Sequence, residues 1–155
     1  RSQKIDIVFE VTGEAGALER ALERVFVDAE AAIDAGCSVL ILSDRATDRE
    51  HAAIPSLLAA SAVHHHFIRA GKRGRADVIV EAGDVREVHH FATVLGYGAS
   101  AVYPYLALRT IEQMEQDELL EGLTAAAAIQ KYMKGADKGL VERFSKNGDS
   151  TRAPD

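Results

Sequence analysis

The stretch from Val78 to Tyr105, VIVEAGDVREVHHFATVLGYGASAVYPY, contains one complete unit of an α/β fold. The aliphatic residues at 78–80 predict a buried strand, and this strand stops at a carboxylate, Glu81. A second apolar run at 99–102 predicts the next strand, which ends at the Tyr-Pro-Tyr sequence of 103–105. The connection between the two strands is long enough for a helix.

That connection also has the apolar spacing of a helix. The residues that carry the spacing are Val88, Phe91, Ala92 and Leu95. Gly96 and Gly98 follow, and we expect both to supply the positive φ angles that commonly end a helix. Strands that alternate with helices pair in parallel through right-handed crossovers, so the stretch predicts a parallel sheet.

The same alternation extends over most of the chain. A loose alternation at 5–11 predicts a first strand, and the aliphatic run at 39–42 predicts another. Helical spacing or helix start and stop signals mark four further segments, 17–36, 55–70, 106–115 and 124–144. We therefore expect an α/β fold of alternating βα units with a mainly parallel sheet.

Polar side chains stand where the predicted strands end. In a parallel sheet these ends share one edge, and α/β folds bind ligands at that edge. The candidates for a ligand or an interface at this edge are Asp44, Arg45, Glu81 and Tyr103. No glycine-rich loop has the Walker or Rossmann spacing, and no nucleophile–base pair can be assigned. The sequence therefore predicts no catalytic residue.

Each of these candidates has two interpretations. The loop after the strand at 39–42 contains acidic and basic residues together, Asp44, Arg45, Asp48, Arg49 and Glu50. Because arginine pairs readily with nearby carboxylates, the favoured interpretation is a structural network in which the charges of the loop pair with one another. Binding of an anionic ligand is the alternative. Glu81 is either a structural partner or a functional or interface residue. Tyr103 is expected to cover the rim of the core, and stacking on a ligand ring is its alternative.

Six histidines raise the question of a metal site. Adjacent helical residues point about 100° apart, so the runs at 64–66 and 89–90 cannot present two neighbouring imidazoles as an i, i+4 pair does. We expect a packed, hydrogen-bonded His64, a solvated His66 and no metal site, and a metal-dependent hydrolase is the weakest alternative. The single cysteine, Cys37, excludes an internal disulfide and is expected to be a buried hydrophobe.

Composition bounds the class of protein. At 155 residues with 47% hydrophobic content, the chain is suited to one folded domain with a sizeable core. The net charge is −6 and the basic residues are scattered, which predicts no nucleic-acid partner. No apolar run approaches the roughly 20 residues that span a bilayer, and no signal-peptide pattern opens the chain. We expect no membrane partner, a cytoplasmic location, and, because the first residue is Arg1, a piece of something longer.

Two long blocks of the chain resemble a known family. They are LILSDR at 40–45 with DREHAAIPSLLAASAVHHH at 48–66, and VEAGDVREVHHFATVLGYGASAVYPYLAL at 80–108. The chain resembles, from about Leu18 to its tail, the central domain of the large chain of glutamate synthase. The closing SKNGDST at 145–151 is similar to the segment with which that family leads into its flavin-binding barrel, although Asn147 and Asp149 replace apolar residues.

The resemblance implies a domain organisation and a role. It implies a central connecting domain at 1–144, similar to a partial or degenerate (βα) barrel, and a tail at 145–155 that leads toward the FMN-binding barrel. Gly148 and Ser150 become weak candidates for flavin contacts. In the complete enzyme a glutaminase domain releases ammonia, which passes through a tunnel to an FMN and iron–sulfur barrel where 2-oxoglutarate becomes glutamate.

This chain contains neither the glutaminase nucleophile nor the cluster cysteines nor the flavin barrel. The resemblance therefore implies a connector between the glutaminase and FMN-binding domains that helps to form the ammonia tunnel, holds no cofactor itself and is inactive alone. The choice among NADPH, NADH and ferredoxin as electron donor is not indicated by this sequence. The alternative from the residues alone is a stand-alone α/β module that binds a small anionic ligand at the strand-end edge.

Overall fold

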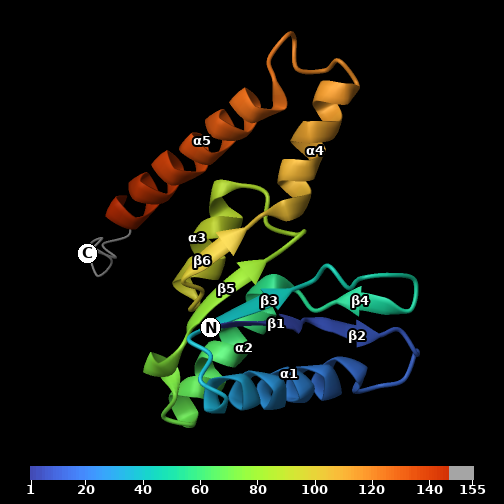
Figure 1. The fold of residues 1–155 in the computed structure, drawn as a ribbon, viewed down its shortest axis with the longest axis vertical. Helices are drawn as coiled ribbons and strands as arrows, with labels where there is room; N and C mark the ends of the chain where they lie inside the picture. Colours follow the sequence, from blue (N-terminus) through green and yellow to red (C-terminus); the bar gives the residue numbers. More distant parts are fainter. Residues whose placement is uncertain (147–155) are drawn as a thin grey trace.

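Four parallel strands form the main sheet, in the order β1, β3, β5 and β6 (Figure 1). The computed structural model describes residues 1–146. The strands are β1 (Ser2–Asp6), β3 (Val39–Ser43), β5 (Asp77–Glu81) and β6 (Ala101–Tyr103). Each strand of this sheet pairs with the parallel strand that comes before it along the chain. Successive strands of a (βα) barrel have the same order. The predicted alternating βα units and mainly parallel sheet are confirmed.

Helices connect the parallel strands and follow the last one. They are α1 (Ala17–Asp34), α2 (Ser56–Arg69), α3 (Val88–Gly96), α4 (Tyr105–Gln116) and α5 (Ala125–Lys146), with a short 3-10 helix η1 (Arg73–Arg75) before β5. Helix α2 contacts both α1 and α3, and α5 contacts α3 and α4. Figure 1 shows α4 and α5 as a hairpin that extends beyond the sheet.

Helix α1 shows how sequence spacing becomes packing. The buried positions of its apolar stripe are Ala21, Val25, Ala29, Ala32 and Ile33. Gly36 ends the helix with a φ of +83°, a conformation that costs glycine little because it has no Cβ. The backbone N–H of Cys37 then donates to the carbonyl of Ala32 at 3.0 Å, and Cys37 is buried as expected.

The two faces of the sheet differ in burial. Register places Leu42 beside Val80, and both are fully buried on the face that packs against the helices. The opposite face, called here the open face, is represented by one register layer, Lys4, Ile41, Ile79 and Ala101. Its two isoleucines are half-buried and its two end residues are exposed. The open face is therefore only partly covered by residues 1–146.

The expected single strand at 5–11 is wrong in its extent. The chain instead forms β1 and then a separate strand β2 (Val8–Glu10), which pairs antiparallel with β4 (His51–Ala53). Ile7 sits between the two sheets, because its N–H donates to the carbonyl of Ser43 and its carbonyl accepts from the N–H of Ile54. Strand β4 lies in a loop that had been expected to contain no strand.

Other predicted boundaries also shift. Gly98 has a φ of +116°, but Gly96 is the last residue of α3 and does not have a positive φ. The strand expected at 99–102 is observed at 101–103, and the helix expected at 124–144 runs from 125 to 146. The predicted flavin contacts of Gly148 and Ser150 lie outside the described residues.

Candidate functional site

The carboxyl ends of the strands bring polar residues into one register layer. Asp6, Ser43, Glu81 and Tyr103 are register partners across the four strands of the sheet. The backbone N–H of Asp44 donates to the carbonyl of Glu81 at 3.3 Å, which holds the β3 end beside the β5 end. The structure thus gathers the four sequence-predicted candidates at one edge, called here the carboxyl edge.

Glu81 is the centre of the hydrogen bonds at this edge. Its Oε1 accepts from Nε of Arg45 at 2.6 Å, and its Oε2 accepts from the hydroxyl of Ser43 at 2.6 Å. The ammonium of Lys4 lies 3.8 Å from Oε2. Burial raises the pKa of Glu81, but the hydrogen bonds from Ser43 and Arg45 outweigh it and hold the pKa below its usual value. Glu81 is therefore a charged, well-paired carboxylate at neutral pH.

Arg45 combines its ion pair with aromatic contacts. Its guanidinium carbon lies 4.1 Å from the ring centroid of Tyr105 and 6.0 Å from that of Tyr103. The hydrogen bond to Glu81 raises the pKa of Arg45 further above its already high value. An anion at this edge would have to compete with Glu81 for the guanidinium. The geometry thus does not favour the small-anion alternative.

Tyr103 keeps part of its ring in solvent. Its fractional exposure is 46%, so it covers the rim only in part and presents an aromatic surface at the carboxyl edge. Leu106, in the first turn of α4, is 42% exposed. An exposed aromatic residue and an exposed leucine near paired charges form the kind of surface that other proteins use for contacts.

Asp44 is the most deeply buried carboxylate among the described residues. It is 5% exposed, and its Oδ2 accepts from the backbone N–H of Gly83 at 2.8 Å. The hydroxyl of Tyr105 also donates to this carboxylate, and burial together with that hydrogen bond raises the pKa of Tyr105 to about 12. Within the part of the chain that the structure describes, Oδ1 of Asp44 has no hydrogen-bond partner.

The charged loop at 44–50 does not form the self-paired network that its composition predicts. Arg45 pairs with Glu81, 36 residues away, rather than with a carboxylate of its own loop. Asp48 accepts from the backbone N–H groups of Glu50 and His51 and from the His51 ring at 2.9 Å. The sequence did not predict the pairing of Arg45 with Glu81, because no local pattern links residues so far apart in the chain.

Of the two histidines whose environments were predicted, His64 agrees with the prediction and His66 does not. His64 is packed and accepts a hydrogen bond from Nε of Arg73 at 2.8 Å, as predicted. His66 is not solvated: its ring stacks on Phe26 with centroids 4.4 Å apart, and its Nε2 lies 2.6 Å from Oε1 of Glu30. Across residues 1–146, no group of three His, Cys, Asp or Glu side chains could hold a metal ion.

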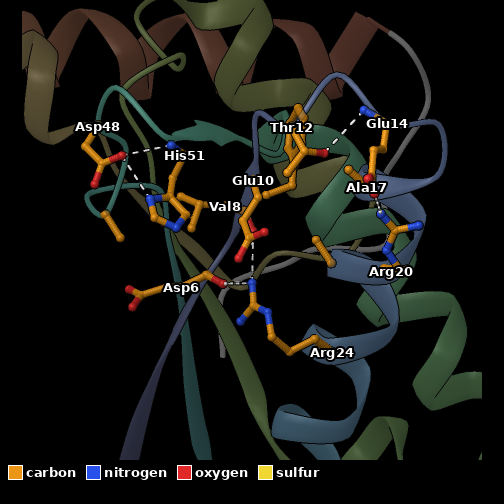
Figure 2. A pocket seen from close by; sticks show the side chains of 13 residues that line it. Asp6, Val8, Glu10, Thr12, Glu14, Ala17, Arg20, Arg24, Asp48 and His51 are labelled. Carbon is orange, nitrogen blue, oxygen red and sulfur yellow. Dashed lines mark hydrogen bonds and ion pairs between the residues drawn. The ribbon is translucent and has the colours of Figure 1, made fainter.

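A pocket that the sequence did not predict lies away from the carboxyl edge. It measures about 600 Å³ and lies between α1 and the ribbon of β2 and β4. Figure 2 shows Arg24 of α1 donating to the carbonyls of Asp6 and Val8, at 3.0 and 2.9 Å. The lining mixes carboxylates and cations and includes none of the four candidates, so this cavity favours neither sign of ligand.

The arrangement at the carboxyl edge is paired rather than reactive. Glu81 accepts hydrogen bonds on both oxygens, one from Arg45 and one from the buried hydroxyl of Ser43. A cysteine-ligated iron–sulfur cluster does not fit this chain, because Cys37 is its only cysteine and is buried in the core. No helix among the described residues is long and apolar enough to cross a membrane.

Comparison with known proteins gives the family. The family model described as glutamate synthase central domain matches residues 1–153. The chain is 47% identical over 151 residues to the glutamate synthase [NADPH] large chain of Bacillus subtilis, covering 97% of this chain and 10% of that protein. It is 36% identical over 148 residues to the glutamate synthase [NADH] of Schizosaccharomyces pombe, covering 95% of this chain and 7% of that protein.

A third relative is named for another electron donor. The ferredoxin-dependent glutamate synthase 2 of Synechocystis is 36% identical over 163 residues, covering 97% of this chain and 10% of the relative. The chain thus spans a tenth or less of the length of these relatives. Because the family model covers almost the whole sequence, the chain belongs to the glutamate synthase central domain family.

Proposed function

We propose that this chain is the central, connecting domain of a glutamate synthase large chain. In such an enzyme, glutamine and 2-oxoglutarate are converted to two glutamates with FMN and an iron–sulfur cluster supplied by other domains. The observation that carries the proposal is the family match over residues 1–153, combined with a carboxyl edge where Glu81 is bonded to Arg45 and Ser43 and where the described residues form no recognisable catalytic set.

The geometry supports a docking role in two places. The open face leaves Ile41 and Ile79 half-buried, and an apolar sheet face gains stability when another layer covers it. The carboxyl edge adds the exposed ring of Tyr103 beside paired charges. We infer that these surfaces meet the glutaminase and FMN-binding domains of the same large chain and contribute to the wall of an ammonia tunnel between them.

The electron donor is proposed to be selected outside this chain. Relatives named for NADPH, NADH and ferredoxin each match at least 95% of it, which is what a domain remote from the donor site would show. We further propose that the protein is cytoplasmic. Residues 1–146 alone are proposed to carry out no FMN chemistry.

An assay of the purified chain tests the proposal. We expect no flavin absorbance after incubation with FMN and no glutamate formation from glutamine and 2-oxoglutarate with dithionite-reduced methyl viologen as electron source. Glutamate formation by this chain without other domains would refute the connector role.

A further inference from the structure

The Asp44 carboxylate is buried with one oxygen unused by the described residues. Its Oδ2 accepts the N–H of Gly83, while its Oδ1 has no partner in residues 1–146. A buried carboxylate oxygen without a donor is costly, and proteins therefore pair buried charges or hydrogen-bond them fully. The orphaned oxygen indicates that a donor from outside these residues reaches Asp44.

The neighbouring cations are already engaged. Arg45 directs its Nε to Glu81 and stacks on the ring of Tyr105, and Lys4 also faces Glu81. In the described part of the chain, Asp44 forms no ion pair, and its side chain accepts from the Gly83 N–H and the Tyr105 hydroxyl. A neutral donor would complete the hydrogen bonds but would leave the charge uncompensated, whereas a cation supplies both.

The surroundings of Asp44 suit a long basic side chain. A Cβ placed on Gly83 would lie 3.2 Å from the hydroxyl of Tyr105 and 3.5 Å from both Oδ2 of Asp44 and Cδ2 of Leu106, so these three groups surround Gly83. Leu106 and Tyr103 are 42% and 46% exposed. Lysine and arginine lay their methylene stems along such apolar surface while the charged head reaches an acidic partner.

We propose that Asp44 is the acceptor for a lysine or arginine side chain from another domain of the same large chain, with the stem of that residue packed on Leu106. This proposal rests on the connector function and names the chemistry of its partner. Because Oδ1 is shielded within residues 1–146, access of the basic group requires a neighbouring side chain such as the exposed Leu106 to turn aside. Because Asp44 follows β3 directly, the contact fixes the partner domain against the carboxyl edge.

Hydrogen–deuterium exchange on the complete large chain tests the proposal. In the wild-type large chain, amides at 81–84 and 103–106 are expected to exchange more slowly than in the 155-residue chain. Asp44→Asn replaces a carboxylate oxygen with an amide and removes the negative charge, so it should speed exchange in both segments at least about tenfold in the large chain. Glu115→Gln, which removes an exposed carboxylate of α4, is the control and should leave exchange in both segments unchanged.

A second variant keeps the test decisive if Asp44→Asn does not fold. Leu106→Lys, at an exposed position, supplies a cation to Asp44 from within the domain and should likewise remove the protection that the large chain adds. Unchanged protection in both variants would overturn the proposal while leaving the connector function intact. If the wild-type segments are no better protected in the large chain than in the 155-residue chain, docking through this edge itself fails.

Discussion

The Nε of Arg45 donates to Oε1 of Glu81 at 2.6 Å, and this contact ties the end of β3 to the end of β5. The pair lies beside the hydroxyl of Ser43, which donates to the other oxygen of the same carboxylate. The carboxyl edge is therefore held in shape before any partner arrives, and a preformed edge loses less conformational entropy on docking.

Removal of the Glu81 charge should destabilise the fold. Glu81→Gln leaves the Arg45 guanidinium without its anion at a position only partly open to solvent, and we expect a loss of about 1–2 kcal/mol in the free energy of unfolding. Urea unfolding followed by circular dichroism measures it. The matched control is Glu112→Gln, whose exposed pair with Arg109 should contribute about 0.5 kcal/mol or less. Equal effects of the two variants would contradict the assigned role of Glu81.

The contribution of Glu81 should depend on pH in one direction. Its folded-state pKa lies below the ordinary value of 4.5, so its stabilisation is fully present above about pH 4.5 and is lost as pH falls through the folded pKa. Urea unfolding of wild type and Glu81→Gln from pH 7 to pH 3 should give a constant difference down to about pH 4.5 and a shrinking one below. A difference that grew on acidification would contradict the assigned charge state.

Two glycines of α5 should respond oppositely to alanine. A Cβ on Gly139 would lie 2.6 Å from Cγ2 of Val88, so Gly139→Ala forces α5 away from α3 and should cost about 1–3 kcal/mol. Gly135 has no neighbour within 4 Å of such a Cβ, and Gly135→Ala should stabilise the helix by about 0.5–1 kcal/mol. Thermal melts of both variants check the packing of α5, and destabilisation by Gly135→Ala would argue against it.

The histidine run should show a difference between neighbours. His66 stacks on Phe26 and bonds Glu30, whereas His65 is exposed. Because the stack is lost, His66→Ala should lower the melting temperature by about 2–4 °C, while His65→Ala should leave it nearly unchanged. Differential scanning calorimetry resolves the two outcomes. A larger drop in melting temperature for His65→Ala than for His66→Ala would contradict the assignment of His66 to the packed face of α2.

Local signals predicted most of the framework. The apolar spacing of α1 and the glycine at 36 placed that helix within two residues of its observed end, because both signals depend on near neighbours. Strand β4 was missed because three residues in a charged loop carry too little periodicity. Its existence depends on β2, more than 40 residues earlier in the chain.

The candidate site was located from sequence, but its pairing was not. Parallel topology was enough to bring Asp44, Arg45, Glu81 and Tyr103 to one edge. The partner of Arg45 and the Tyr105 hydroxyl at Asp44 depend on side-chain directions across strands, which composition does not encode. His66 was misplaced for the same reason, since Phe26 and Glu30 belong to another helix.

The connector role is tested most directly by comparing glutamine-dependent with ammonium-dependent glutamate formation by the complete large chain. A contact that serves ammonia transfer matters only when ammonia comes from glutamine. Tyr103→Ala, at the carboxyl edge, should therefore lower the glutamine-dependent rate about tenfold, equivalent to about 1.4 kcal/mol, and leave the rate with added ammonium unchanged. Tyr97→Ala, an exposed tyrosine at the end of α3, should change neither rate. Equal loss of both rates in Tyr103→Ala, or no loss of either, would contradict the account.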